Sequence, residues 1–158
     1  MSYCPRPTIN LFSFATKDLT APETRYRFDV TTCRDPIGQA HLKGTCANGT
    51  DDKILEWIAK DPKVGAIRDT VTFLIGLHTL PPQSEGSLSV GFHDFHGIWI
   101  SPAIAILVAR DIMAGKLANV NIHHERIKVT PVAPTKGWGG IHLLKAAGKG
   151  EETPCLTP

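Results

Sequence analysis

The sequence lacks the cysteine patterns that mark a metal site or a disulfide framework. Its four cysteines, Cys4, Cys33, Cys46 and Cys155, form no C-x-x-C pair and no zinc-finger spacing. The first residues lack a basic region followed by an apolar one, and no apolar run approaches the roughly 20 residues that span a bilayer. We therefore expect a cytoplasmic protein with free thiols and no membrane partner.

A large excess of charge of either sign is absent as well. The 158 residues include 17 Lys and Arg against 15 Asp and Glu, which gives a net charge of +2 at pH 7. This charge is too small to indicate nucleic-acid binding by itself. The hydrophobic content of 42% and charged content of 20% are typical of a single globular domain that buries its own core.

Residue patterning predicts four strands. Apolar and polar residues alternate over residues 8–14 and 26–32, which is the period of a strand. Residues 87–91 form a third short strand, and a fourth begins over residues 119–122.

Three helices are predicted between these strands. Asp51 can cap a short helix, and Asp61 followed by proline opens a longer one. Ser101, also followed by proline, is a good N-cap for a third helix that is apolar nearly all round and ends at Gly115. The expected inner face of the longer helix consists of Val64, Ile67, Val71, Leu74, Ile75 and Leu77.

The order of these elements predicts an α/β domain over residues 1–130. We expect a four-stranded, mostly parallel or mixed sheet with about three helices, because the second-to-third and third-to-fourth connections are long enough for parallel crossovers. Residues 131–158 are rich in Pro and Gly and are predicted to form an extended tail with at most one short ordered piece, at 141–144.

Polar side chains follow the strands that this topology makes parallel. The carboxyl ends of parallel strands meet at one edge of a sheet, where ligands of open α/β sheets bind. Residues 31–34, 93–96 and 123–126 are expected to meet there. The predicted ligand-binding residues are Arg34, Gly91, His93, His96, Gly97, Ser101 and His124.

The segment from Gly91 to Ser101 links the third strand to the third helix. Free N–H groups and the positive end of the helix dipole make such a turn a suitable anion site, where His93 and His96 can donate when protonated. The lysine of a P-loop is absent. An ordinary strand-to-helix turn, with its aromatic side chains in the core, accounts for the same residues equally well.

A second interpretation of the histidines is a metal-assisted hydrolase. His93, His96 and His124 could bind a metal, with Asp94 or Glu125 as the base. However, H-x-x-H pairs on loops arise by chance, and the metalloprotease helix, the Gly-x-Ser-x-Gly elbow and a cysteine-nucleophile signature are all absent. We therefore predict no catalytic residue, no metal and no cofactor, with a histidine-dependent enzyme as the alternative.

Taken together, these motifs resemble the C-terminal domain of the RapZ family, including its free-standing relatives. The family's F-D-V/L-R strand and (N/D)-P turn are similar to Phe28–Val30 and to Arg34–Pro36. Its G-C-x-G-G-x-H-R-S loop is similar to Gly91–Ser101, and its H-R-D strand end is similar to His124–Arg126 with base and acid exchanged. The resemblance covers residues 8–130.

The resemblance implies a phosphate- or carboxylate-binding pocket at the glycine loop, recognition of an amino-sugar phosphate and binding of regulatory RNA. The chain departs from the pattern, because no Arg or Lys lies between Gly91 and Ser101 and Thr31 stands where the family has arginine. Each lost guanidinium removes a charge-assisted contact worth about 1.5–3 kcal/mol. The scaffold is therefore expected to persist with a changed ligand.

These motifs lead to three functional hypotheses. The first is a regulatory or adapter domain that binds a small anionic metabolite, such as a sugar phosphate or nucleotide, with RNA and a second copy as further partners. Phe92, Phe95 and Trp99 could then stack on a base or sugar ring, although they are more often core residues. The second is the histidine-dependent hydrolase. The third is a structural or protein-interaction domain that has lost its pocket.

Overall fold

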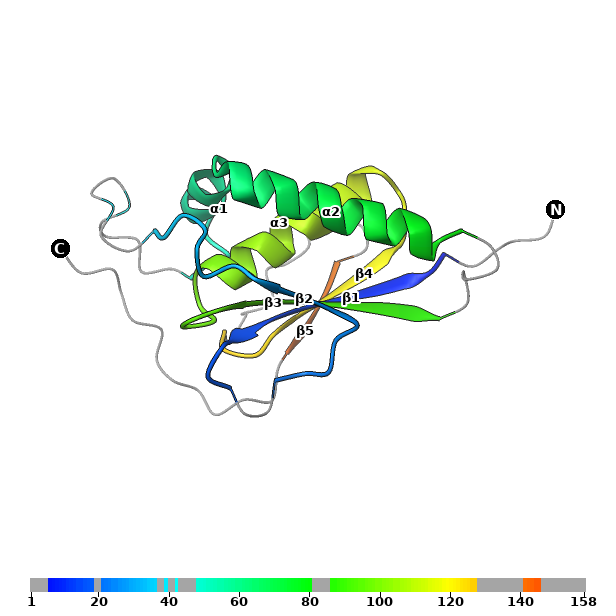
Figure 1. The fold of residues 1–158 in the computed structure, drawn as a ribbon, viewed down its shortest axis with the longest axis horizontal. Helices are drawn as coiled ribbons and strands as arrows, with labels where there is room; N and C mark the ends of the chain where they lie inside the picture. Colours follow the sequence, from blue (N-terminus) through cyan, green and yellow to red (C-terminus); the bar gives the residue numbers. More distant parts are fainter. Residues whose placement is uncertain are drawn as a thin grey trace.

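Five parallel strands form one sheet, and three helices cover one of its faces (Figure 1). This computed structural model describes residues 6–18, 21–36, 39, 42, 48–80, 86–127 and the backbone of 141–145. The strands, in the spatial order β2-β3-β1-β4-β5, are β1 Thr8–Ala15, β2 Tyr26–Asp29, β3 Ser87–Asp94, β4 Asn119–His124 and β5 Ile141–Lys145.

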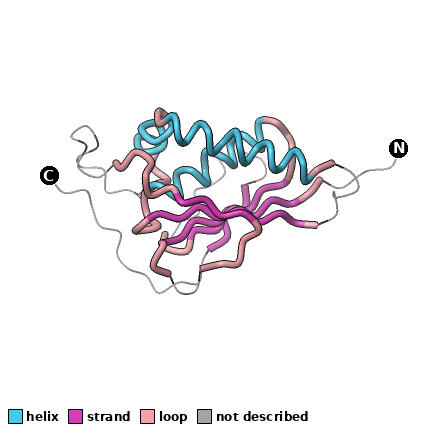
Figure 2. The backbone as a smooth tube through the Cα atoms, viewed as in Figure 1, coloured by secondary structure: helices cyan, strands magenta, loops and turns pink. Residues whose placement is uncertain are grey.

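The helices are α1 Asp52–Ala59, α2 Pro62–His78 and α3 Ile100–Ala114. Helix α3 contacts β1, β3 and β4, and helices α1 and α2 pack on α3. Figure 2 shows the same layers, with the helices on one side of the strands. Because α3 lies between the sheet and the other two helices, it buries ten of its fifteen residues, which confirms the prediction from its all-round apolar composition.

The predicted α/β class, parallel sheet and three helices are confirmed. The direction of the first strand could not be told from the sequence. In the structure it is the central strand and runs parallel to both neighbours, β3 and β4. A fifth strand, β5, pairs with β4 at the position of the one ordered piece predicted in the tail. The remainder of residues 131–158 lies outside the described residues.

The N-terminal caps of α1 and α2 are also confirmed. The Asp51 carboxylate accepts a hydrogen bond from the Lys53 N–H at 2.9 Å, and the Asp61 carboxylate accepts one from the Lys63 N–H at 2.9 Å. The predicted inner face of α2 was wrong at Leu77, which is 45% exposed, while His78 is buried beside it. No helix in the described part of the chain is long and apolar enough to cross a bilayer.

Two predictions at the junction of β3 and α3 were wrong. The strand continues to Asp94 instead of ending at Gly91, which lies inside the strand opposite Phe12. Helix α3 begins at Ile100, so Ser101 lies within its first turn and does not cap it. The side chain that bonds the first turn is Asp94, as described below.

Candidate functional site

The carboxyl ends of β1, β2, β3 and β4 lie at one edge of the sheet. All these strands are parallel, and the register places Ala15 opposite Asp94 and Ser13 opposite His124. The predicted meeting of the ends of β2, β3 and β4 is therefore confirmed by the topology, and the end of β1 lies there as well. The side chains that follow them, however, point in different directions.

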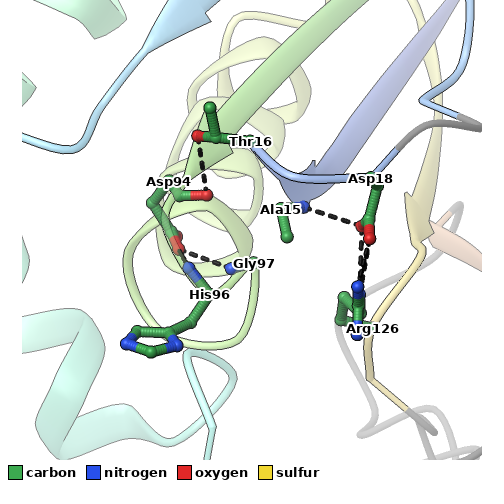
Figure 3. A network of polar contacts seen from close by, with 7 residues as sticks. All are labelled: Ala15, Thr16, Asp18, Asp94, His96, Gly97 and Arg126. Carbon is green, nitrogen blue, oxygen red and sulfur yellow. Dashed lines mark hydrogen bonds and ion pairs between the residues drawn. The ribbon is translucent and has the colours of Figure 1, made fainter.

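The Asp94 carboxylate occupies the turn between β3 and α3. One of its oxygens accepts hydrogen bonds from the N–H groups of His96, at 2.8 Å, and Gly97, and the other accepts one from Ser101, at 2.7 Å. Figure 3 shows the carboxylate turned toward the backbone of His96 and Gly97. Asp94 is buried, as are its bonds to Gly97 and Ser101, and its bond to His96 is partly buried.

These three N–H groups are the donors that were expected to hold an external anion. Helix N-termini attract negative charge because their first N–H groups have no partner within the helix and the helix dipole is positive there. In this protein the negative charge comes from the chain itself. We call the N–H groups of His96, Gly97 and Ser101 the cradle, and Asp94 fills it.

The backbone of Asp94 also joins the cradle to β1. Its carbonyl oxygen accepts hydrogen bonds from the Thr16 N–H, at 2.7 Å, and from the Thr16 hydroxyl, at 3.0 Å (Figure 3). Gly97 packs against the end of the same strand with a positive φ of 70°, and a Cβ there would lie 2.5 Å from the Ala15 nitrogen. The glycine therefore serves close backbone packing.

Two other glycines near this edge of the sheet allow neighbouring groups to approach the backbone closely. A Cβ at Gly91 would lie 2.9 Å from both the Phe14 ring and the Thr24 hydroxyl, so this residue makes room for neighbouring side chains. Gly49 donates its N–H to the Ile98 carbonyl at 2.8 Å and abuts the Trp99 carbonyl. Its segment covers the start of α3.

His124 is buried and faces the helix layer. Its Nδ1 lies 2.6 Å from the Ser13 hydroxyl, and only 1% of the residue is exposed. Burial lowers the pKa of His124 from 6.5 to about 4, because a charged imidazole loses its hydration there. His124 is therefore neutral at pH 7 and out of reach of a ligand.

His93 lies on the other face of the sheet. Its ring stacks on Phe14 with centroids 5.6 Å apart, and its Nδ1 lies 3.2 Å from the Thr16 hydroxyl. Because successive residues of a strand point to opposite faces, the neighbouring residues Ser13 and Phe14 hold His124 and His93 on opposite sides. Among the described residues, no group of three or more His, Cys, Asp or Glu side chains could hold a metal ion.

The two arginines near this edge make contacts within the chain. The Arg34 guanidinium lies 4.9 Å from the centre of the Trp57 ring, and its backbone N–H bonds to Asp61. Arg126 forms a two-pronged ion pair with Asp18 (Figure 3). This hydrogen-bonded pair lowers the pKa of Asp18, and it ties the loop after β1 to the end of β4.

A small pocket of about 110 Å³ opens beside the cradle. Its lining includes the two carboxylates Asp35 and Asp94, with His96 as the one residue that can carry a positive charge. Pockets for small molecules usually span roughly 300–1,000 Å³. The pocket's size and acidic lining favour neither a sugar phosphate nor a nucleotide. Its other lining residues are Thr31, Phe95, Trp99 and Ile100.

The three aromatic residues of the turn have different surroundings. Phe92 and Trp99 belong to the buried core, whereas Phe95 is 60% exposed and touches the His96 ring edge-on at 4.9 Å. Of the three, Phe95 alone is therefore available for stacking on a ligand.

Asp94 was expected at this edge of the sheet, but its role as the acceptor of the turn's N–H groups was not predicted. It was considered only as a base beside a metal. The available signal was its position three residues before a glycine, because aspartate side chains commonly accept hydrogen bonds from N–H groups two and three residues later in turns. The search of known protein families matched no family model, and no curated protein matches the chain.

The burial of His124 makes a pH-dependent prediction. Its folded pKa of about 4 lies below its ordinary value of 6.5, so protonation favours the unfolded chain. The stability that the neutral His124 contributes to the folded chain is fully present above pH 6.5 and is lost as the pH falls toward 4. We expect the free energy of unfolding to fall by about 2 kcal/mol between pH 7 and pH 5, measured by urea denaturation.

His124→Asn provides the matched control, because an amide can keep the bond to Ser13 and does not titrate. In this variant the free energy of unfolding should fall much less between pH 7 and pH 5 than it does in the wild type. Burial also lowers the pKa of His123, so this residue should leave a smaller dependence of stability on pH, of the same sign. An equal slope in the wild type and in His124→Asn would show that His124 is not the titrating group.

Proposed function

We propose that this protein is a non-catalytic interaction domain whose anion cradle is closed by its own Asp94 carboxylate. It keeps the scaffold of an anion-binding α/β domain and acts through its surface. The observation that carries this proposal is the set of three hydrogen bonds that the buried Asp94 carboxylate accepts from the N–H groups of His96, Gly97 and Ser101. An external phosphate cannot use donors that an internal carboxylate already holds.

The positions of the other predicted ligand groups support the same conclusion. His124 is buried on one face of the sheet and His93 stacks on the other, while Arg34 lies against Trp57. The exposed group left beside the pocket is His96, which faces an acidic lining. This arrangement gives less support to the anionic-metabolite and hydrolase hypotheses than to an interaction domain.

A thermal-shift titration tests this proposal against the metabolite hypothesis. We expect inorganic phosphate, glucosamine 6-phosphate and a nucleoside monophosphate, each at about 10 mM and constant ionic strength, to raise the Tm of the wild type by less than about 1 °C. A genuine ligand at 100 times its Kd adds about 2.7 kcal/mol, which corresponds to a rise of roughly 5–10 °C in a chain of this size.

A rise of that size with any of the three compounds would overturn the proposal, provided that His96→Ala abolishes it. RNA binding is tested separately by the fluorescence anisotropy of a labelled single-stranded RNA. Phe95→Ala is the variant of choice there, because Phe95 is the exposed ring of the turn. Tight, Phe95-dependent binding at physiological salt would support the RNA hypothesis instead.

A further inference from the structure

Helix α2 carries apolar side chains on the face that points away from the core. Phe73 is 65% exposed, Leu77 45% and Leu80 57%, and these are three of the four large hydrophobic side chains that stand exposed in the described part of the chain. Their spacing of four and three residues places them in one row, which we call the apolar stripe. Phe73 and Leu77 lie within α2, and Leu80 follows its end.

The apolar stripe lies directly opposite the face that α2 buries. At 100° per residue, Val71, Ile75 and His78 project about 140–200° away from Phe73. Helix α2 is therefore apolar on both sides, whereas a surface helix normally carries polar residues on its outer side. Single exposed hydrophobic residues are common, whereas a row of three on one helix forms a continuous apolar patch, and the largest such patch on a protein is often functional.

A notch lies beside the apolar stripe at Gly76. A Cβ at this position would meet no heavy atom within 4 Å, so the space over the helix backbone is open. The Phe73 ring lies one turn earlier on the same side. The helix therefore carries both a large projecting side chain and a gap that can receive one.

We propose that two copies of this chain associate through α2, packed antiparallel, with Phe73 of each copy seated over Gly76 of the other. A two-fold interface uses the same surface on both subunits, so a contact from residue i to residue j is matched by one from j to i. The Phe73–Gly76 pairing meets this condition. The inference goes beyond the proposed function and does not depend on the cradle.

The charges on α2 favour the antiparallel arrangement. Between residues 69 and 80 the only side chain charged at pH 7, with His neutral, is Asp69, at one end. In the register that places Phe73 against Gly76, the two Asp69 residues lie about 16 Å apart along the interface, beyond the screening length of about 8–10 Å. A parallel pair would instead bring the two carboxylates side by side.

The size of the apolar stripe predicts a weak dimer. The exposed parts of its three side chains amount to on the order of 300 Å² in each copy, or about 600 Å² in a pair. Stable interfaces bury about 1,200–2,000 Å² in total. We therefore expect reversible association at roughly 10–500 μM protein and no permanent dimer.

Sedimentation equilibrium of the full chain over this concentration range tests the proposal. The wild type is expected to show a reversible monomer–dimer equilibrium. Gly76→Gln fills the notch, and Phe73→Ala removes the side chain that enters it, so each should raise the dimer Kd at least about 10-fold. Gly76→Gln should also raise the Tm of the monomer by about 1–3 °C, because glutamine favours a helix more than glycine does.

Two matched variants control for changes of the same kind elsewhere. Gly65→Gln makes the same change on α2 at the other glycine with open space, outside the proposed overlap. Phe95→Ala removes an exposed ring from the β3–α3 turn. Both should leave the dimer Kd unchanged. A wild type that stays monomeric at every concentration would overturn the proposal, as would a dimer that Phe73→Ala and Gly76→Gln do not weaken.

Discussion

Replacement of Asp94 by alanine is expected to lower the free energy of unfolding by about 3–5 kcal/mol. The substitution leaves the N–H groups of His96, Gly97 and Ser101 without their acceptor, and those of Gly97 and Ser101 are buried. A hydrogen bond to a charged group contributes about 1.5–3 kcal/mol, and the loss of three neighbouring bonds is less than additive. Urea denaturation at pH 7 measures the difference, and the two-state fit requires an unchanged m-value.

Asp94→Asn distinguishes the charge of Asp94 from its hydrogen-bonding geometry. The amide keeps the size of the side chain and one acceptor oxygen, but its nitrogen is a donor that faces other donors. We expect this variant to lose less than Asp94→Ala and clearly more than about 1 kcal/mol. A loss below about 1 kcal/mol for both variants would show that the cradle contributes little and that Asp94 is not its essential occupant.

Replacement of Gly97 by alanine is expected to cost at least about 3 kcal/mol. The residue has a φ of 70°, and a Cβ there would lie 2.5 Å from the Ala15 nitrogen and 2.7 Å from the Phe14 carbonyl carbon. Backbone atoms of the central strand cannot move aside easily. The variant therefore combines the strain of a positive φ, about 1–3 kcal/mol, with a backbone overlap that must displace the turn from β1.

Gly86→Ala is the matched control for the conformational part of this effect. Gly86 has a φ of 120°, but a Cβ at this position would meet no heavy atom within 4 Å. This variant should show the backbone strain alone, about 1–3 kcal/mol. If Gly97→Ala costs no more than Gly86→Ala, the turn does not need its close approach to β1, and the account of the cradle as a rigid turn is wrong.

The sequence was sufficient for the α/β class, the three helices and four of the strands, because hydrophobic period and connection lengths agree, but it did not give the direction of β1. Alternation located β1, and the Asp61–Pro62 pair located the start of α2. The apolar composition of α3 predicted its burial between two layers. These signals are local, and each reflects a single physical requirement, such as a cap for free N–H groups or an apolar face against the core.

The site was harder to predict because it depends on where side chains point. The topology brings His93 and His124 to one edge, but strand alternation sends them to opposite faces, and a one-residue uncertainty in a strand end reverses such an assignment. The sequence shows that Asp94 and Ser101 flank a turn. It does not show that the carboxylate bends back onto the N–H groups of that turn, which requires Gly97 to place the backbone against β1.

The most direct test of the central claim is rescue of Asp94→Ala by formate. This anion has the size and charge of the missing carboxylate and can accept bonds from the same three N–H groups. We predict that about 100 mM sodium formate raises the Tm of Asp94→Ala by several degrees over an equal concentration of sodium chloride, with no such difference for the wild type. Ile75→Ala, a core variant of comparable instability, controls for general salt effects and should also show no difference. Equal responses to formate in all three proteins would contradict the claim that Asp94 occupies an anion cradle.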